Sequence, residues 1–446
     1  MEDKFKDSQV QYSRSDAKKA VEDGNSVLAQ EIYESLWENS KKTDPYLLYE
    51  YGKILRKNKK SERFVELCRE LGGNSPMLSN NHINSVLCWC LYESHIKNYQ
   101  YKENVEQFNT FIKRAQYILE KCVQENADIC FINPYVLTII KVIKILKMRS
   151  SINYQTIISW LEYLDPSKLP DIPYQIQNGE WKNKEIASPK EFYYQSLIKA
   201  LEKTSQYERC IEMCTKALEE IKKFHYRNHI WFQSRRFFCK CMISEGYPDE
   251  IINEYKSFAN RYKLWFVYHK LANICLRYNK PSDGLYYACK AFEGNFEAEK
   301  MVNLMYDLAM LWEVNGEKEN ASKFYHGSAY YRNLHHWSLS EELQYAIKKY
   351  GLDIEKRPDI KNLKTIVLNH LNSIEPESQR LGGTIINLLS HGKSGFIKPD
   401  QGLDNIFFSM RNAEKYKDMR LGTQVTYSLS TDGQKRPIAV EIKIRR

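Results

Sequence analysis

The residues best suited by type to meet a ligand lie near the end of the 446-residue chain, in the segment HGKSGFIKPDQGLDNIFFSM at 391–410. Here Phe396 and Phe407 stand among lysines and glycines. Aromatic rings that stack on bases, beside lysines that meet phosphates, are the combination with which proteins hold single-stranded nucleic acid. From Leu381 onward the chain has eleven basic and six acidic residues, an excess of five that is half of its net charge of +10. The segment therefore favours an anionic partner.

Other residue groups that could do chemistry are weaker. His225 and His229 have the i, i+4 spacing of two metal ligands on a helix, but no carboxylate or thiol pattern accompanies them. Arg332 and His335 in YYRNLHHW stand too close together for the six-residue separation of arginine-histidine ribonuclease motifs. No phosphate-binding glycine loop, nucleophile elbow or paired-carboxylate motif is found. We expect a protein that is not an enzyme and that holds neither a metal nor a cofactor.

Cysteine usage and the N-terminus predict a cellular location. CWC at 88–90 and CKC at 239–241 lack the two-residue gap of a zinc knuckle, and Cys210 and Cys214 form an i, i+4 helical pair. Reduced thiols buried among helices are typical of cytosolic proteins. The first twenty residues have no apolar signal core, and no uninterrupted apolar run of about eighteen residues occurs. We expect a soluble, cytoplasmic protein.

A 37-residue period organises the helix-forming part of the chain. Steps of 37 from Ile198 reach Arg235, Ala272 and Ala309, and matching residues stand four before, three after and sixteen after each anchor. The sets are Tyr194, Trp231, Tyr268 and Met305; Leu201, Phe238, Cys275 and Trp312; and Cys214, Ile251, Ala288 and Tyr325. Turn-forming stretches separate the last two sets. The pattern predicts a stacked helix-turn-helix array.

These units resemble the tetratricopeptide repeat, although their step is 37 residues and that family's is 34. The segment 268–292 resembles it most clearly, with Gly284 where the family usually has alanine, and 47–76 also fits. The matching residues are Tyr268, Leu271, Ala272, Cys275, Gly284, Ala288 and Ala291, and Leu48, Tyr51, Gly52, Leu55, Phe64, Cys68 and Pro76. The resemblance spans about 16–345 and implies a mainly α-helical, superhelical solenoid.

Prolines and linkers divide this solenoid into segments. We expect helical repeats over 1–164 and 191–350, separated at 165–190 by a segment with four prolines that is an insertion or a hinge. A further helix and a polar linker occupy 351–380. A separate domain is expected over 381–446.

That last domain reads as five short strands, GTIINLL, GKSGFIKP, DNIFFSM, GTQVTYSLS and RPIAVEIKI, which suit a small barrel of the OB type. It resembles the cold-shock domain family. The residues that carry the resemblance are Gly383, Thr384, Ile385, Gly395, Phe396, Ile397, Pro399, Asp400, Asn405, Ile406, Phe407, Phe408, Gly422, Val425, Pro437, Ala439 and Val440.

The resemblance implies that single-stranded RNA or DNA crosses the first three strands, with bases stacked on Phe396 and Phe407. Asn387, Ser394 and Ser409 replace three of the family's usual stacking groups. Binding should then shift toward salt-sensitive lysine and arginine contacts with phosphates. These contacts are expected from Lys393, Lys398, Arg411, Lys415 and Lys417.

We interpret the chain as an adaptor whose solenoid binds a protein partner on its concave surface and whose barrel contacts single-stranded nucleic acid, most simply RNA. Arg235, Arg236, Tyr268 and Lys270 are candidates for extending the nucleic-acid track. Two alternatives stay open. The barrel is a cap that no longer binds nucleic acid, or the chain is a regulatory subunit of a multi-protein bacterial system such as phage defence.

Overall fold

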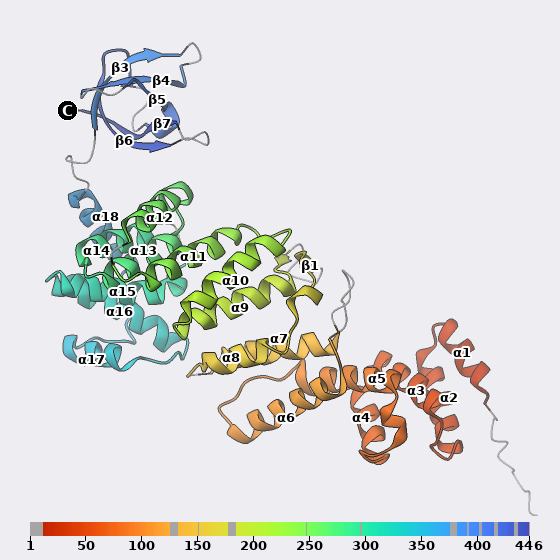
Figure 1. Cartoon of the computed structure of the whole chain (residues 1–446). Coiled ribbons are helices and arrows are strands. Elements are labelled where there is room, and N and C mark those ends of the chain that lie inside the picture. Colours follow the sequence, from red (N-terminus) through yellow and green to blue (C-terminus); the bar gives the residue numbers. More distant parts are fainter. Residues whose placement is uncertain are drawn as a thin grey trace, which may run out of the picture. The chain divides into compact units, whose positions relative to one another are not determined.

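The computed structural model describes residues 12–124, 133–149, 151–176, 184–246, 248–294, 297–374, 381–389, 392–400, 404–413, 418–431 and 436–445. The chain divides into two compact units, Met1–Cys239 and Lys240–Arg446. The first unit consists of helices and one short hairpin of strands, and the second contains helices followed by a β-barrel (Figure 1).

The helices of the first unit follow one another in antiparallel hairpins. Several of them begin at a polar residue followed by proline, because the polar side chain accepts a backbone N–H of the first turn and proline needs no partner there. Asp44, Asn133 and Ser188 cap α3, α7 and α9 in this way. The helices are α1 (Arg14–Glu22), α2 (Ser26–Asn39), α3 (Pro45–Lys57), α4 (Ser61–Glu70), α5 (Asn81–Leu91), α6 (Val105–Lys121), α7 (Pro134–Leu146), α8 (Tyr154–Leu161), α9 (Pro189–Lys203) and α10 (Tyr207–Glu220).

The helix bounds follow the helix-turn-helix pattern expected from the sequence. The four anchors Ile198, Arg235, Ala272 and Ala309 lie on α9, α11, α13 and α15, and each is followed by a second helix that starts after a short turn. The later helices are α11 (His229–Ile243), α12 (Asp249–Tyr262), α13 (Trp265–Arg277), α14 (Pro281–Glu293), α15 (Val302–Val314), α16 (Lys318–Leu334), α17 (Glu341–Tyr350) and α18 (Ile360–Ile374). In the second unit α17 packs on α16, and α18 packs on α14 and α16. The helical part is a solenoid like that of tetratricopeptide repeats.

Small residues let the two helices of a hairpin approach closely. A Cβ added at Gly52 of α3 would lie 2.5 Å from a ring carbon of Phe64 in α4. One added at Gly284 of α14 would lie 3.4 Å from the carbonyl oxygen of Ala272 and 3.0 Å from Leu311. The Cβ at Gly52 would clash with the Phe64 ring, whereas the Cβ at Gly284 would be tight only against Leu311, so packing excludes a side chain most strongly at Gly52.

Arg235 occupies the same repeat position as Ala272, and its charge is matched inside the fold. Its Nη1 atom donates to Oε2 of Glu202 at 2.8 Å, and its guanidinium lies 5.0 Å from the centre of the Trp231 ring. The side chains of Arg235 and Glu202 are only 17% and 9% exposed. Tyr268 is likewise buried, with its hydroxyl 3.2 Å from Oδ1 of Asn260. Both side chains are largely buried and bonded to other residues of the protein. The structure therefore does not support Arg235 and Tyr268 as an extension of the nucleic-acid interface of the barrel.

The proline-containing segment 165–190 is folded where it is described. A short 3-10 turn at Pro166–Lys168 is capped by Asp165. Strands β1 (Tyr174–Ile176) and β2 (Lys184–Ile186) then pair in an antiparallel hairpin, and Pro189 opens α9. Prolines here mark turns and a helix start, as their fixed φ favours.

The C-terminal strands form a closed barrel with the order β3-β4-β5-β7-β6. The strands are β3 (Leu381–Leu388), β4 (Ser394–Pro399), β5 (Ile406–Ser409), β6 (Gln424–Thr431) and β7 (Pro437–Ile444). Only the β5–β7 pair is parallel among these neighbours. The five strands expected from the sequence are confirmed, and the connectivity is that of an OB-type barrel.

The barrel is filled by one side of each strand. Its core consists of Ile385, Ile397, Ile406, Phe408, Met419, Val425, Tyr427, Ala439 and Ile442. Glycines allow the strands to close around it: a Cβ at Gly395 would collide with the carbonyl oxygen of Asn387 on β3, and a Cβ at Gly383 would lie 2.8 Å from that of Lys398. No helix in the described ranges combines the length and the apolar composition needed to cross a bilayer.

We predict that Gly52→Ala destabilises the first unit even though alanine is the better helix former. Relief of the clash with the buried Phe64 ring should cost about 1–3 kcal/mol, against roughly 1 kcal/mol gained in helix propensity. Thermal unfolding followed by circular dichroism should show a lower Tm. Gly73→Ala is the control, since a Cβ there meets nothing within 4 Å. Equal midpoints for both variants would contradict the packing argument.

Candidate nucleic-acid interface

Three neighbouring strands place the predicted stacking residues in one row. In the strand register Asn387 of β3 pairs with Phe396 of β4, and Phe396 pairs with Phe407 of β5. Paired residues on adjacent strands point to the same face of a sheet. The two rings contact each other edge to face, with centroids 5.7 Å apart and planes inclined at 72°.

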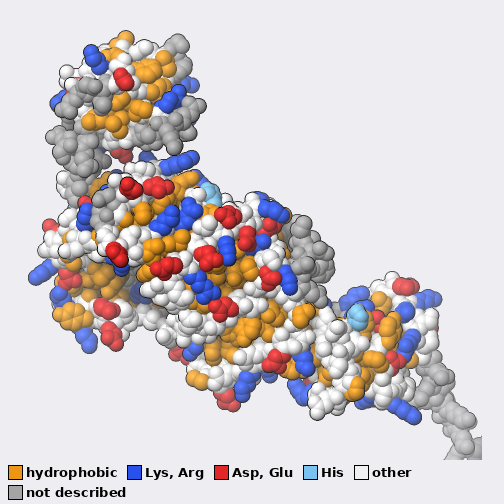
Figure 2. All heavy atoms as spheres, viewed as in Figure 1, with side chains coloured by type: hydrophobic (Ala, Val, Ile, Leu, Met, Phe, Trp, Pro, Cys, Tyr) orange, Lys and Arg blue, Asp and Glu red, His pale blue; other side chains and the backbone are white. Residues whose placement is uncertain are grey.

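This row lies on the outside of the barrel. Ile397, Ile406 and Phe408 are buried in the core, so the residues that alternate with them point outward. Phe407 is 36% exposed, and Phe396 is partly buried beside it. Figure 2 shows hydrophobic side chains gathered on the face of the barrel in view, with lysines and arginines at its margin. Neither ring is needed to fill the barrel, and Phe407 is the more accessible surface for a base.

Basic side chains accompany the rings. Lys398 is exposed two residues after Phe396 on β4, on the same face, opposite Thr384 of β3. Lys393 is exposed just before β4, and Arg411 is exposed in the turn Met410–Asn412 that follows β5. Among the described residues, Lys398 and Arg411 have no ion-pair partner. Lys415 and Lys417 lie outside the described residues.

The three positions at which the sequence departs from the cold-shock pattern fall on the same strands. Asn387 is exposed at the β3 end of the row, and Ser394 and Ser409 face each other across β4 and β5. Ser394 is 6% exposed. The outer face therefore carries two rings bordered by short polar side chains. Among these residues, only the two rings offer surfaces on which a base can stack.

Ile386 is an exposed apolar residue next to this row. Alternation with the buried Ile385 places it outside, where it is 41% exposed, and the β3–β4 register shift between Ile385 and Asn387 leaves Asn387 exposed as well. In regular alternation Ile385 and Asn387 would share a face, so the pattern of the sequence gives no signal for the bulge. Ile386 adds apolar surface beside Asn387.

An ion pair joins the ends of two strands near this face. Nη1 of Arg445, which follows β7, donates to Oδ2 of Asp400, which follows β4, at 2.9 Å. Gly382 has no side chain at this point, and a Cβ there would collide with the Asp400 carboxylate. Because Arg445 neutralises Asp400, this acidic residue of the barrel does not offset the positive charge of Lys398.

The other candidates from the sequence have structural roles. His225 contacts the carbonyl oxygen of Glu185 at 2.8 Å through Nε2, and its backbone N–H donates to Glu191. His229 lies against the Phe224 ring. Within the described ranges no three histidine, cysteine or acidic side chains gather as a metal site. Burial raises the pKa of four thiols, those of Cys68, Cys90, Cys241 and Cys275, to about 12, so they are unreactive.

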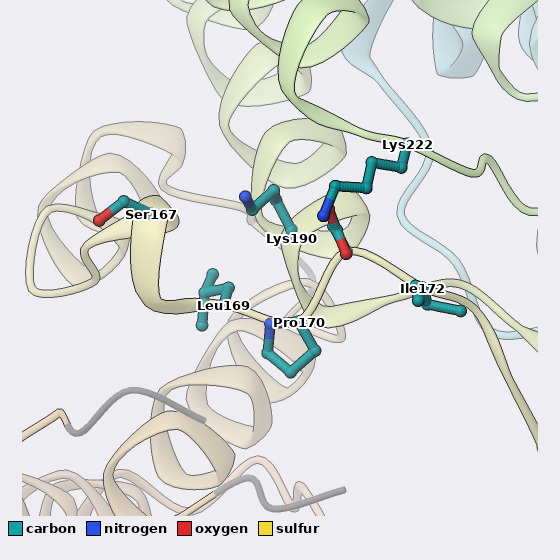
Figure 3. A pocket seen from close by; sticks show the side chains of 7 residues that line it. Ser167, Leu169, Pro170, Ile172, Lys190 and Lys222 are labelled. Atoms are coloured by element: carbon teal, nitrogen blue, oxygen red, sulfur yellow. The ribbon is translucent and has the colours of Figure 1, made fainter. Parts of the chain in front are cut away.

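A cavity of about 220 Å³ lies in the proline-containing segment of the first unit. In Figure 3, Lys190 of α9 and Lys222 lie above Leu169, Pro170 and Ile172. Nζ of Lys222 is 3.5 Å from Oδ2 of Asp171. The lining residues include no histidine or cysteine and no pair of carboxylates, so the cavity has no arrangement for acid-base or nucleophilic catalysis.

No family model matches the chain, and no curated protein matches it. Solved structures with similar folds include a human IFIT1 dimer with PPP-AAAA, at 12% identity and a TM-score of 0.32, covering 80% of this chain and 78% of that one. The APC/C hetero-tetramer Cut9-Hcn1 has 11% identity and a TM-score of 0.28, covering 82% and 73%. The P58(IPK) TPR domain has 12% identity and a TM-score of 0.22, covering 81% and 98%. At these scores the likenesses do not decide what this chain binds.

The inward and outward alternation on β5 predicts that substitution of two adjacent phenylalanines destabilises the barrel by different amounts. Phe408→Ala removes a fully buried ring from the barrel core and should cost about 3–5 kcal/mol. Phe407→Ala removes a partly exposed ring and should cost about 1 kcal/mol or less. Hydrogen exchange of the barrel amides, read by mass spectrometry, measures both changes locally. Similar loss of protection in the two variants would show that Phe407 also supports the barrel.

Proposed function

We propose that the chain is a non-enzymatic adaptor that couples a protein partner, bound by the helical solenoid, to single-stranded RNA or DNA, bound by the barrel. The observation that carries this proposal is the outward row of Phe396 and Phe407 with exposed Lys398 beside it on a small closed barrel. Rings that fill no core position, beside a lysine that forms no ion pair with the described residues, are suited to bases and phosphates.

The contacts available make this interface weak by itself. Stacking on an aromatic ring contributes roughly 1–3 kcal/mol per base and tolerates every sequence. Phe407 offers the more exposed ring, and Asn387, Ser394 and Ser409 supply none. Phosphate contacts from Lys393, Lys398 and Arg411, with Lys415 and Lys417, carry the remainder and make binding fall with salt. RNA is favoured as the partner only by the cold-shock resemblance.

Weak binding suits an adaptor because tethering raises apparent affinity. When a partner on the solenoid holds the barrel near a nucleic acid, the second contact becomes intramolecular and is governed by an effective concentration. Helical repeats offer extended surfaces for such a protein partner.

The test is fluorescence anisotropy of labelled single-stranded RNA and DNA with the full chain at two salt concentrations. We expect Phe396→Ala with Phe407→Ala to weaken binding about tenfold or more, as the loss of one or two stacked bases requires. Lys398→Gln should lower the salt slope by about 0.7. Leu429→Ala is the control, because Leu429 is exposed on β6, two strands away from β5.

The polar replacements Asn387, Ser394 and Ser409 also support a second function, in which the barrel is a structural part of a protein-interaction scaffold. Unchanged affinity in the double phenylalanine variant, or no binding by any form, would favour this function over the adaptor. Association with an enzyme subunit of a bacterial defence system stays a prediction.

A further inference from the structure

Five lysines of the first unit gather on two helices of successive repeats. Lys141, Lys144 and Lys147 are spaced by three residues along α7 and its C-cap. On α9, Phe192, Ser196, Lys199 and Lys203 are spaced by four, three and four, which places them on one helical face. We call the surface formed by Lys141, Lys144, Lys147, Lys199, Lys203 and Phe192 the basic face.

Direct contacts bring the two helices' residues together. Nζ of Lys147 donates to the hydroxyl of Ser196 at 2.8 Å. The ammonium groups of Lys147 and Lys144 lie 5.1 Å and 5.9 Å from the centre of the same Phe192 ring. Lys144 and Lys147 therefore reach the face of α9 that also carries Lys199.

The positive charge on this face has no acidic partner in the part of the chain that the structure describes. None of the five lysines forms an ion pair with any residue that the structure describes. The carboxylate that acts on Lys199 is Glu202, and Arg235 of α11 already pairs with it at 2.8 Å. Like charges held close without a counter-ion raise the free energy of the folded chain.

The crowding is strongest at Lys147. Burial, together with the charges of Lys199 and Lys144, lowers the pKa of Lys147 to about 8. Partial burial and the charges of Arg235 and Lys203 also lower the pKa of Lys199, while Glu202 acts in the opposite direction. A bound anion would offset this cost.

We propose that the basic face of the first unit binds the phosphate groups of single-stranded nucleic acid. Lysine presents a compact point charge that can meet phosphate oxygens without the fixed geometry of an arginine fork. The basic face has five lysines, and its neighbouring arginine is already paired. Three residues of helix rise about 4.5 Å, so the α7 lysines place their charges one after another along the helix.

This surface is separate from the barrel and does not depend on the barrel's function. The test therefore uses the full chain carrying Phe396→Ala and Phe407→Ala, so that binding by the barrel's rings is removed. Into this background we introduce Lys144→Gln, Lys147→Gln and Lys199→Gln together. Matched changes at Lys42, Lys53 and Lys216, which pair with Glu38, Glu50 and Glu212, remove the same charge elsewhere in the unit.

Anisotropy with labelled single-stranded RNA and DNA should show about tenfold or greater loss of affinity in the basic-face variant, with a salt slope smaller by about 2. The matched variant should keep the background's affinity within about threefold. Equal affinity of background and basic-face variant overturns the proposal. So does displacement of the strand by a glutamate-rich peptide, which would make the ligand an acidic protein segment, or by a mononucleotide at equal phosphate concentration, which would make it a small anion.

A second measurement tests, without a ligand, whether the charge of Lys147 destabilises the folded chain. The pKa of Lys147 is lower in the folded chain than the usual 10.5. Below pH 8 the lysine is charged in both states and the full cost of burying it is present, and stability rises as pH passes from 8 to 10.5. Lys147→Gln should therefore unfold at a higher temperature than the natural chain at pH 7, with the difference shrinking above pH 8. A lower or unchanged Tm at pH 7 would remove the premise of an uncompensated charge.

Discussion

Each helical hairpin of this chain has an apolar face that only a neighbouring hairpin can cover, and the architecture depends on that contact. The packing excludes a side chain at Gly52, where a Cβ would clash with Phe64, and is tight at Gly284, where a Cβ would lie 3.0 Å from Leu311. Small residues recur 37 positions apart at Ala272 and Ala309, and both are fully buried. The constraint is local in space, so a repeat array can extend without one central core.

The same repetition decides what the polar side chains can do. Once one face of a helix is buried against the next hairpin, the remaining residues of successive first helices are brought into proximity. At Arg235 this produces a satisfied pair with Glu202, and at Lys144, Lys147 and Lys199 it produces charge without a partner. The difference matters because the ion pair uses the charge of Arg235 inside the protein, whereas lysines without an ion pair can still attract an anion.

The barrel applies a different constraint to its own residues. In a closed sheet every strand has one side that must fill the interior, and successive residues alternate between the two sides. Phe408 and Ile397 take the inner positions, so Phe407 and Phe396 are left on the surface as a contacting pair. Stability of the barrel and recognition of a ligand therefore use different residues of the same short strands.

The outward placement of Phe396 and Phe407 was expected from the cold-shock resemblance. The helix-turn-helix units, the turn positions and the five strands were determined by the sequence by itself. These features follow from local preferences and from the periods of 3.6 and 2, which a linear pattern records. The sequence did not reveal the bulge between Ile385 and Asn387, because this change of register in the β3–β4 pairing has no local signal. Nor did the i, i+3 spacing of Lys141, Lys144 and Lys147 show whether carboxylates faced them. The contact of α7 with α9 and the ion pair of Arg235 with Glu202 decided this. The bonded residues are 49 and 33 positions apart in the chain, so only the tertiary structure brings them together.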